Sequence, residues 1–387
     1  MLCSFYQRNY TFLILLPQQL SKMKKKIVWT SDRDMLLLKD LDRKTGCYML
    51  KLKYIIHILS GVRFNKIKEC LDRSHEISGK NRFWMVFDMG WCALRYGAGY
   101  YDYMMYGFFD RTARERDTYL TRLRNKKLIS YLNEDEYNHC TNNKNDFNIL
   151  FKEYLHRDVL DGRNATFEEF EIFMSDKDAC FAKPEEGSSG HGVEKLYKKD
   201  FESLKAMFNY IQSKGNCAIE QCVEQHTTMS RLYPHSVNCM RIVTDLAGDE
   251  VHIAYVVLKT GNNGSVCDNS GQGGLICAVD KEKGIVTGIA SDDCIAHYYV
   301  KHPYTGVTFD GFQIPLFKEA IAMCKEAAHV VPQIRHIGWD VAITLTGPVL
   351  IEGNSFPGTD LCQLYWNTPG RKGLMPFYRR ILPELKF

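Results

Sequence analysis

The sequence predicts an α+β fold in which a mainly helical N-terminal region precedes two mixed lobes. Residues 27–125 carry apolar side chains at helical spacing, for example in segments 35–41 and 48–59. From residue 179 onward, short apolar runs alternate with glycine-rich loops, a pattern typical of strands and turns. Near the C-terminus, the apolar runs 341–345 and 349–351 flank Thr-Gly-Pro, which predicts a β-hairpin.

These patterns divide the chain into four parts. We expect residues 1–26, a short apolar run followed by lysines, to be a disordered leader. Residues 27–140 form the mainly helical region, 141–216 a small lobe and 217–387 a C-terminal lobe. In the small lobe, a strand, a glycine-rich loop, a second strand and a helix follow one another, which favours a compact α+β arrangement.

Composition and charge exclude several classes of protein. Hydrophobic residues make up 45% and charged residues 25% of the 387 residues, which is ordinary for a globular protein. The formal net charge of +4 is small and gives no support for a nucleic-acid partner. The apolar run 12–16 is far shorter than the roughly 20 residues of a spanning helix, so we expect no integral membrane segment. The 14 cysteines include no C-x-x-C pair, which favours reduced thiols in a cytoplasmic protein.

Three oxygen-bearing side chains accompany the predicted hairpin, namely Asp340, Glu352 and Asn354. Because side chains of a strand alternate between its two faces, Glu352 and Asn354 share one face. A loop centred on Gly347 would place Asp340 opposite Asn354 on that face, whereas a two-residue loop would place it on the other. Two carboxylates and an amide oxygen suit Mg²⁺, although a solvated hairpin face would carry the same residues.

A second candidate lies in residues 179–193, which read ACFAKPEEGSSGHGV. Lys183 follows a short apolar run, and Gly187, Gly190 and Gly192 come after it in a loop. Glycines let backbone N–H groups approach phosphate oxygens, and a lysine at a strand end adds positive charge. The loop has neither the Gly-Lys-Ser/Thr of a Walker A loop nor the order of a Rossmann fingerprint. Taken alone, it is also compatible with an ordinary flexible loop.

Between these stretches, residues 217–226 read CAIEQCVEQH, a strand-like run with Glu220 and Glu224. A lysine with a glycine-rich loop, an acidic strand and then Asp…Glu-x-Asn follow in an order that resembles the ATP-grasp superfamily. In more detail, the chain is similar to the sugar-transfer-associated, or alpha-L-glutamate-ligase-related, ATP-grasp family. The resemblance extends from about residue 142 to 363 and is carried by FAKPEEGSSGHGV, AIEQCVEQH, SVNCMRIVT, DNSGQGG, HPYTG and IGWDVAIT…IEGNSFPGTDLCQ. A looser likeness lies upstream, in WCALRYGAGYYDYMMYGFF.

The resemblance implies an ATP-grasp fold, in which two α+β lobes clamp ATP between them. It assigns Lys183 to the nucleotide phosphates, together with Lys144, for which Lys152 is the second choice. The loop that would cover ATP as a lid consists of Gly187, Ser188, Ser189, Gly190 and Gly192.

The resemblance also implies how the base and the sugar of ATP are bound. Glu220 and the neighbouring backbone, with Val223, would bind the adenine edge. Glu224 is a candidate for the ribose hydroxyls, although the position of this acid varies in the family.

Arg241 and Lys259 are candidate catalytic residues, because each lies inside a predicted apolar strand where a charge needs a partner. A phosphate or carboxylate is one candidate partner, and in that case Arg241 would stabilise the acylphosphate oxygens. An ion pair with Asp340 or Glu352 is the other.

The activity implied by the resemblance is an ATP- and Mg²⁺-dependent ligase that joins a carboxylate to an amine through an acylphosphate. The association with sugar transfer points to a small-molecule or glycan substrate and to polysaccharide biosynthesis. Two alternatives stay open: an ATP-grasp kinase that phosphorylates a sugar hydroxyl, and a nucleotide-binding scaffold without turnover. The sequence leaves the donor, the acceptor and the oligomeric state open.

Overall fold

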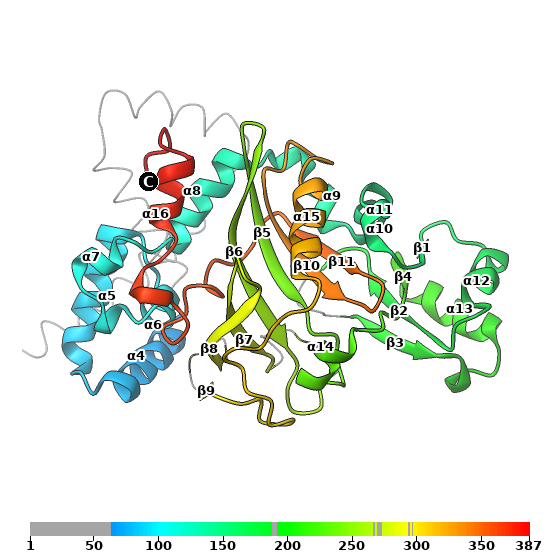
Figure 1. The fold of residues 1–387 in the computed structure, drawn as a ribbon, viewed down its shortest axis with the longest axis horizontal. Coiled ribbons are helices and arrows are strands. Elements are labelled where there is room, and N and C mark those ends of the chain that lie inside the picture. The colour runs from blue at the N-terminus through cyan, green and yellow to red at the C-terminus, as the bar shows by residue number, and fades with distance from the viewer. Residues whose placement is uncertain (1–62, 188–191, 266–267, 269–272, 293–294, 296) are drawn as a thin grey trace, which may run out of the picture. The chain divides into compact units, whose positions relative to one another are not determined.

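The computed structural model describes residues 63–187, 192–265, 268, 273–292, 295 and 297–387, so the predicted leader and the helical segments before residue 63 lie outside it. Residues 65–387 form one compact unit (Figure 1). The first part of this unit is helical, which confirms the mainly helical N-terminal region. Its helices and short 3-10 helices are α4 (Phe64–Ser78), α5 (Arg82–Tyr96), α6 (Tyr100–Met105), η1 (Phe108–Asp110), α7 (Ala113–Arg116), α8 (Arg122–Leu132), η2 (Asp135–Tyr137), α9 (His139–Asn142), α10 (Lys144–Leu150) and α11 (Lys152–Leu155).

Two antiparallel sheets follow these helices. The four-stranded sheet has the order β1-β4-β2-β3, and the seven-stranded sheet has the order β11-β10-β5-β6-β7-β8-β9. The strands are β1 (Val159–Asp161), β2 (Ala179–Pro184), β3 (Glu194–Tyr197), β4 (Cys217–Gln221), β5 (Met240–Ala247), β6 (Glu250–Thr260), β7 (Leu275–Asp280), β8 (Ile285–Ser291), β9 (Tyr298–Tyr299), β10 (His336–Ile343) and β11 (Pro348–Asn354). The helices between and after them are α12 (Phe167–Met174), η3 (Lys198–Asp200), α13 (Leu204–Ser213), α14 (Thr227–Leu232), α15 (Phe317–Ala327), η5 (Pro369–Arg371) and α16 (Met375–Ile381).

Helices and sheets together confirm the predicted α+β class. Strand β4 begins at the predicted boundary between the lobes and pairs with β1 and β2 of the small sheet. The limits of the lobes stay a prediction.

The capping pattern in the sequence explains where α12 begins. The side chain of Thr166 accepts a hydrogen bond from the backbone of Glu169, and the Glu169 side chain accepts one from the backbone of Thr166. This reciprocal arrangement satisfies N–H groups that have no partner within the helix. Asp200 is a residue type that suits a helix N-cap, but α13 begins later, because Ser203 caps it and residues 198–200 form η3.

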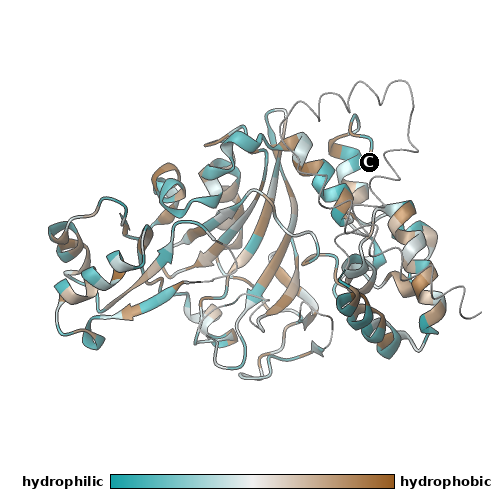
Figure 2. Ribbon diagram, turned by 180° about the vertical axis from the view of Figure 1, so that it is seen from behind, coloured by the Kyte–Doolittle hydropathy of each residue, from teal (hydrophilic) through white to brown (hydrophobic). Residues whose placement is uncertain are grey.

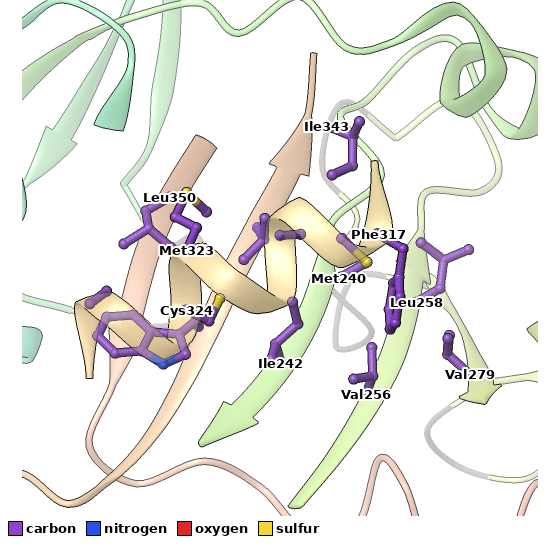
Figure 3. Packing of buried hydrophobic residues seen from close by; sticks show 14 of the residues in the cluster. Met240, Ile242, Val256, Leu258, Val279, Phe317, Met323, Cys324, Ile343 and Leu350 are labelled. Atoms are coloured by element: carbon purple, nitrogen blue, oxygen red, sulfur yellow. The ribbon is translucent and has the colours of Figure 1, made fainter. Parts of the chain in front are cut away.

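The seven-stranded sheet has an apolar cluster on each face. On one face, α15 contributes Phe317, Met323 and Cys324 to a cluster with side chains of β5 and β6 such as Met240 and Leu258 (Figure 3). The other cluster joins β5, β6 and β7 to aromatic side chains of the N-terminal helices and to the C-terminal segment. Figure 2 shows hydrophobic residues along the long central strands. A sheet covered on both faces holds its strands rigidly, which allows it to fix polar side chains at one end.

Helices long and apolar enough to cross a membrane are not found in the part of the chain that the structure describes.

Candidate functional site

A cavity of about 590 Å³ is lined by residues of α9, α10, β2, β4 and β11. These elements come from both sheets and from the helices that precede them. Six of the residues assigned from the sequence line this cavity: Lys144, Lys183, Gly187, Glu220, Glu352 and Asn354. The fold therefore gathers side chains that are far apart in the chain.

Lys144 is the first residue of α10, and Asn143 caps that helix by accepting hydrogen bonds from two backbone N–H groups. The backbone N–H of Lys144 donates to the carbonyl of Glu185 at 2.8 Å, and its Nζ donates to the carbonyl of Gly187 at 3.1 Å. The lysine is thereby tied to the start of the glycine-rich loop. Burial lowers the pKa of Lys144, because an ammonium loses hydration there. A phosphate would offset that loss.

Lys183 and Glu220 form an ion pair in the same cavity. Phe181 lies opposite Glu220 in the β2–β4 ladder, so Lys183, two residues on, is the diagonal neighbour of Glu220 on the same face. Its Nζ lies 2.7 Å from Oε2 of Glu220, and the guanidinium of Arg157 lies 2.9 Å from the same oxygen. Burial alone would raise the pKa of Glu220, but the charges of Lys183 and Arg157 outweigh it and hold the pKa at about 2.

Asp340 lies at the centre of a buried cluster of charges on β5, β6 and β10. Nε of Arg241 lies 2.5 Å from one carboxylate oxygen, and Nζ of Lys259 lies 2.8 Å from the other. Lys259 also lies 3.8 Å from the buried carboxylate of Asp268. The two predicted cations thus have an anionic partner within the protein, which was one of the two alternatives. Burial raises the pKa of Asp340, but these cations more than compensate and lower it.

The hairpin forms as predicted, but its register is neither of the two that the sequence left open. Ile343 pairs with Pro348, so residues 344–347 form a four-residue turn, closed by a hydrogen bond from Thr344 N–H to the carbonyl of Gly347. Asp340 pairs with Glu352, not with Asn354 as a loop centred on Gly347 would require.

A β-bulge produces this register. Val341 pairs with Leu350 while Asp340 pairs with Glu352, so Ile351 is the extra residue. Without the bulge, a four-residue turn would leave Asp340 opposite Ile351 and Glu352 on the other face. The bulge restores Asp340, Glu352 and Asn354 to one face, which is the arrangement that the metal prediction requires.

The other predicted residues that the structure describes do not line the cavity, and Asp340, Arg241 and Lys259 are among them. Val223 packs against a small apolar cluster with Cys239 and Val349, and Glu224 is exposed. Gly192 has a φ of 75°, a left-handed conformation that favours glycine, and a Cβ there would approach Pro184. Their assigned roles stay predictions. Ser188, Ser189 and Gly190 lie outside the described residues.

Two residues of the site were not anticipated from the sequence. Asn148 lines the cavity and donates to Glu220 at 3.3 Å, and Arg157 pairs with the same carboxylate. The signal available in the sequence was Glu220, an acid within an apolar strand, because a buried carboxylate requires nearby hydrogen-bond donors. The sequence does not indicate which donors the fold brings to it.

Comparisons with known proteins bear on the family of the chain. A family model described as sugar-transfer associated ATP-grasp matches residues 123–376. ATP-grasp ligase PsnB complexed with minimal precursor is similar at 13% identity, over 70% of this chain and 71% of that chain, with a TM-score of 0.40. D-alanyl-alanine synthetase A from Vibrio cholerae is similar at 13% identity, over 63% and 65% of the two chains, with a TM-score of 0.38. No curated protein matched the sequence. The family match carries the assignment, because structural similarities this low do not.

Proposed function

Because the chain belongs to the sugar-transfer associated ATP-grasp family and is an ATP-grasp ligase, we propose that it joins a carboxylate to an amine through an acylphosphate. The reaction depends on ATP and Mg²⁺. We extend the proposal to a carboxylate or amine on a sugar or glycan, in polysaccharide or cell-surface glycan biosynthesis. The family description supports this extension.

The observation that carries the proposal is the arrangement of charges around one cavity. Lys144 and Lys183 line it from α10 and β2, while Glu352 and Asn354 line it from β11. Cations suit the phosphates of a nucleotide, and oxygen donors suit the divalent ion that accompanies them. A cavity of about 590 Å³ is within the range of small-molecule sites.

The proposed chemistry has two steps. The substrate carboxylate attacks the γ-phosphorus of ATP, the bond to the β,γ-bridging oxygen breaks, and ADP leaves. The amine then attacks the acyl carbon, the C–O bond of the acylphosphate breaks, and inorganic phosphate leaves while the nitrogen loses a proton. Lys144 and Lys183 bind the nucleotide phosphates. Arg241 and Lys259 are paired with Asp340, and from that position they add positive charge near the transferring group.

The residues of the hairpin fit Mg²⁺. Glu352 lies opposite Asp340, and burial together with the charge of Asp340 raises the pKa of Glu352. A divalent cation would relieve this repulsion between two carboxylates. Among the described residues no group of three His, Cys, Asp or Glu side chains could hold a metal ion, so the set requires the amide oxygen of Asn354. Bound there, Mg²⁺ would neutralise the phosphoryl group during transfer.

An ATP-consumption screen tests the proposal. The protein is incubated with ATP, Mg²⁺ and pooled uronic acids and amino acids, and products are read by mass spectrometry. We expect ADP and inorganic phosphate in equal amounts, an amide product, and a hydroxamate when hydroxylamine replaces the amine. A phosphorylated sugar without free phosphate would instead identify a kinase, and ATP binding without consumption would identify a scaffold.

A further inference from the structure

Arg157 contacts both sheets from the short segment between α11 and β1. Its Nη2 donates to the carboxylate of Glu220 at 2.9 Å and to the carbonyl of Ile351 at 3.2 Å. Its Nη1 donates to the carbonyl of Leu350. The Arg157 side chain is 3% exposed. One guanidinium therefore connects β4 of the small sheet with β11 of the large sheet.

The two carbonyls belong to the bulge that sets the register of the hairpin. Strand β11 is at the edge of its sheet, so its outward carbonyls have no neighbouring strand, and Ile351 is the residue that the ladder leaves unpaired. A buried carbonyl without a donor is costly, and an arginine fork can serve two acceptors at once. Arg157 thus stabilises the backbone conformation that turns Glu352 toward the face of Asp340.

The preceding residue extends the same contact along the edge strand. Nδ1 of His156 lies 3.0 Å from the carbonyl of Pro348. His156 has a φ of 44°, a left-handed conformation that ends α11 and turns the chain toward β11. Residues 156 and 157 together contact the carbonyls of Pro348, Leu350 and Ile351.

The contact of Arg157 with Glu220 orders the side of the cavity where Lys183 lies. Glu220 accepts from Arg157 and from Lys183, and both contacts involve its Oε2. Arg157 thereby holds in place the Glu220 carboxylate that pairs with the Lys183 ammonium. When Lys183 moves to a phosphate, Arg157 still neutralises Glu220, so the buried acid keeps a partner.

We propose that Arg157 is a positioning residue for Mg²⁺–ATP. Through the bulge at Ile351, Arg157 couples the orientation of Glu352 on one side of the cavity to that of Lys183 on the other. The inference rests on the proposed function, because it assumes that Glu352 holds Mg²⁺ and that Lys183 holds a phosphate. It goes beyond that function by assigning metal orientation to a residue that touches neither the metal nor the nucleotide.

The test compares Arg157→Lys with a matched control, Arg163→Lys. Lysine keeps the charge opposite Glu220 but lacks the planar fork that reaches Leu350 and Ile351 as well. Arg163 also forms ion pairs, at 2.6 Å to Asp161 and 2.9 Å to Asp146, and both partners lie outside β11. The affinity for ATP is measured with and without Mg²⁺ by calorimetry, and thermal unfolding is followed for each variant.

We expect the gain in ATP affinity that Mg²⁺ provides to fall about 10- to 100-fold in Arg157→Lys, as for other residues that orient metal ligands. Metal-free ATP affinity should change little, and Arg163→Lys should keep the wild-type dependence on Mg²⁺. A variant Arg157→Gln, which also removes the charge, should lose metal-free affinity in addition.

Three results would overturn the inference. If the ATP affinity of Arg157→Lys depends on Mg²⁺ as in the wild type, this inference is wrong and the proposed function is unaffected. Failure of both Arg157 variants to fold also overturns it, because the role of Arg157 is then structural. If the ATP affinity of the wild-type protein does not depend on Mg²⁺, both the proposed function and this inference are wrong.

Discussion

Asp340 and Glu352 lie directly opposite each other on β10 and β11, and the single extra residue Ile351 places them there. The two carboxylates differ in their surroundings. Asp340 pairs with Arg241 and Lys259, whereas burial and the neighbouring charge of Asp340 raise the pKa of Glu352. Asp340 is therefore held by protein cations, whereas Glu352 lines the cavity.

The packing beside this pair predicts the effect of a small substitution. A Cβ at Gly338 would lie 2.7 Å from Cβ of Pro357 and 3.1 Å from Cδ of Arg241. Because the proline is rigid, we expect Gly338→Ala to lower the free energy of unfolding by about 1–3 kcal/mol. Denaturant titration measures this change.

Gly90→Ala in α5 is the control for that experiment. A Cβ there would meet nothing within 4 Å, and alanine favours a helix interior. We expect this variant to raise the free energy of unfolding by about 0.5–1 kcal/mol. Equal effects of the two substitutions would contradict the tight packing at Gly338.

The hairpin was predictable from the sequence, but the pairing of its acids was not. Gly347 and Pro348 between β-branched runs indicate a turn, because few other residues suit its conformation. The four-residue turn alone would place Glu352 on the face opposite to that of Asp340, and the bulge at Ile351 brings it back to the same face. Arg157 donates to the carbonyls of this bulge, and local sequence does not reveal the contact because the partners of Arg157 in β4 and β11 are distant in the chain.

Lys183→Ala tests the assignment of the phosphate side. The variant removes one of the charges near Glu220, but Arg157 still pairs with that acid, so the fold should persist. We expect ATP affinity to fall about tenfold or more, since a charge-assisted hydrogen bond is lost. Lys214→Ala, which removes an exposed lysine paired with Glu194, is the control and should bind ATP normally. A large drop in melting temperature with unchanged ATP affinity would identify Lys183 as a purely structural partner of Glu220.

The ionisation of Glu220 predicts how stability depends on pH. Burial would raise its pKa, but Lys183 and Arg157 hold it at about 2, below the 4.5 of a free side chain. The stability that this carboxylate contributes is therefore complete above pH 4.5 and is lost as the pH falls through about 2. We expect Glu220→Gln to cost about 3 kcal/mol at pH 7, because two buried cations lose their partner.

The difference in free energy of unfolding between wild type and Glu220→Gln should become smaller as the pH is lowered from 5 to 3. Chemical denaturation at several pH values measures it. A difference that stays constant over this range would show that the charge of Glu220 contributes nothing to stability.

The arginine-rich segment shows a further limit of sequence reasoning. The run of arginines between residues 111 and 124 favours a solvated helix face. In the structure, however, Arg111 is buried and donates to the carbonyl of Tyr365, and Arg116 pairs with Asp88. Their partners are distant in the chain or on another helix. Charge patterns alone cannot distinguish such contacts from exposure to water, because both use the same residue types.

The most direct test of the account is the ATP affinity of Glu352→Gln, measured with and without Mg²⁺. Glutamine keeps the shape of the side chain but removes the charge that offsets the metal. We expect an intact fold, loss of most turnover, and Mg²⁺-dependent ATP affinity reduced far more than metal-free affinity. Near-normal turnover and an unchanged dependence on Mg²⁺ would contradict the metal site, and with it most of the proposed ligase mechanism.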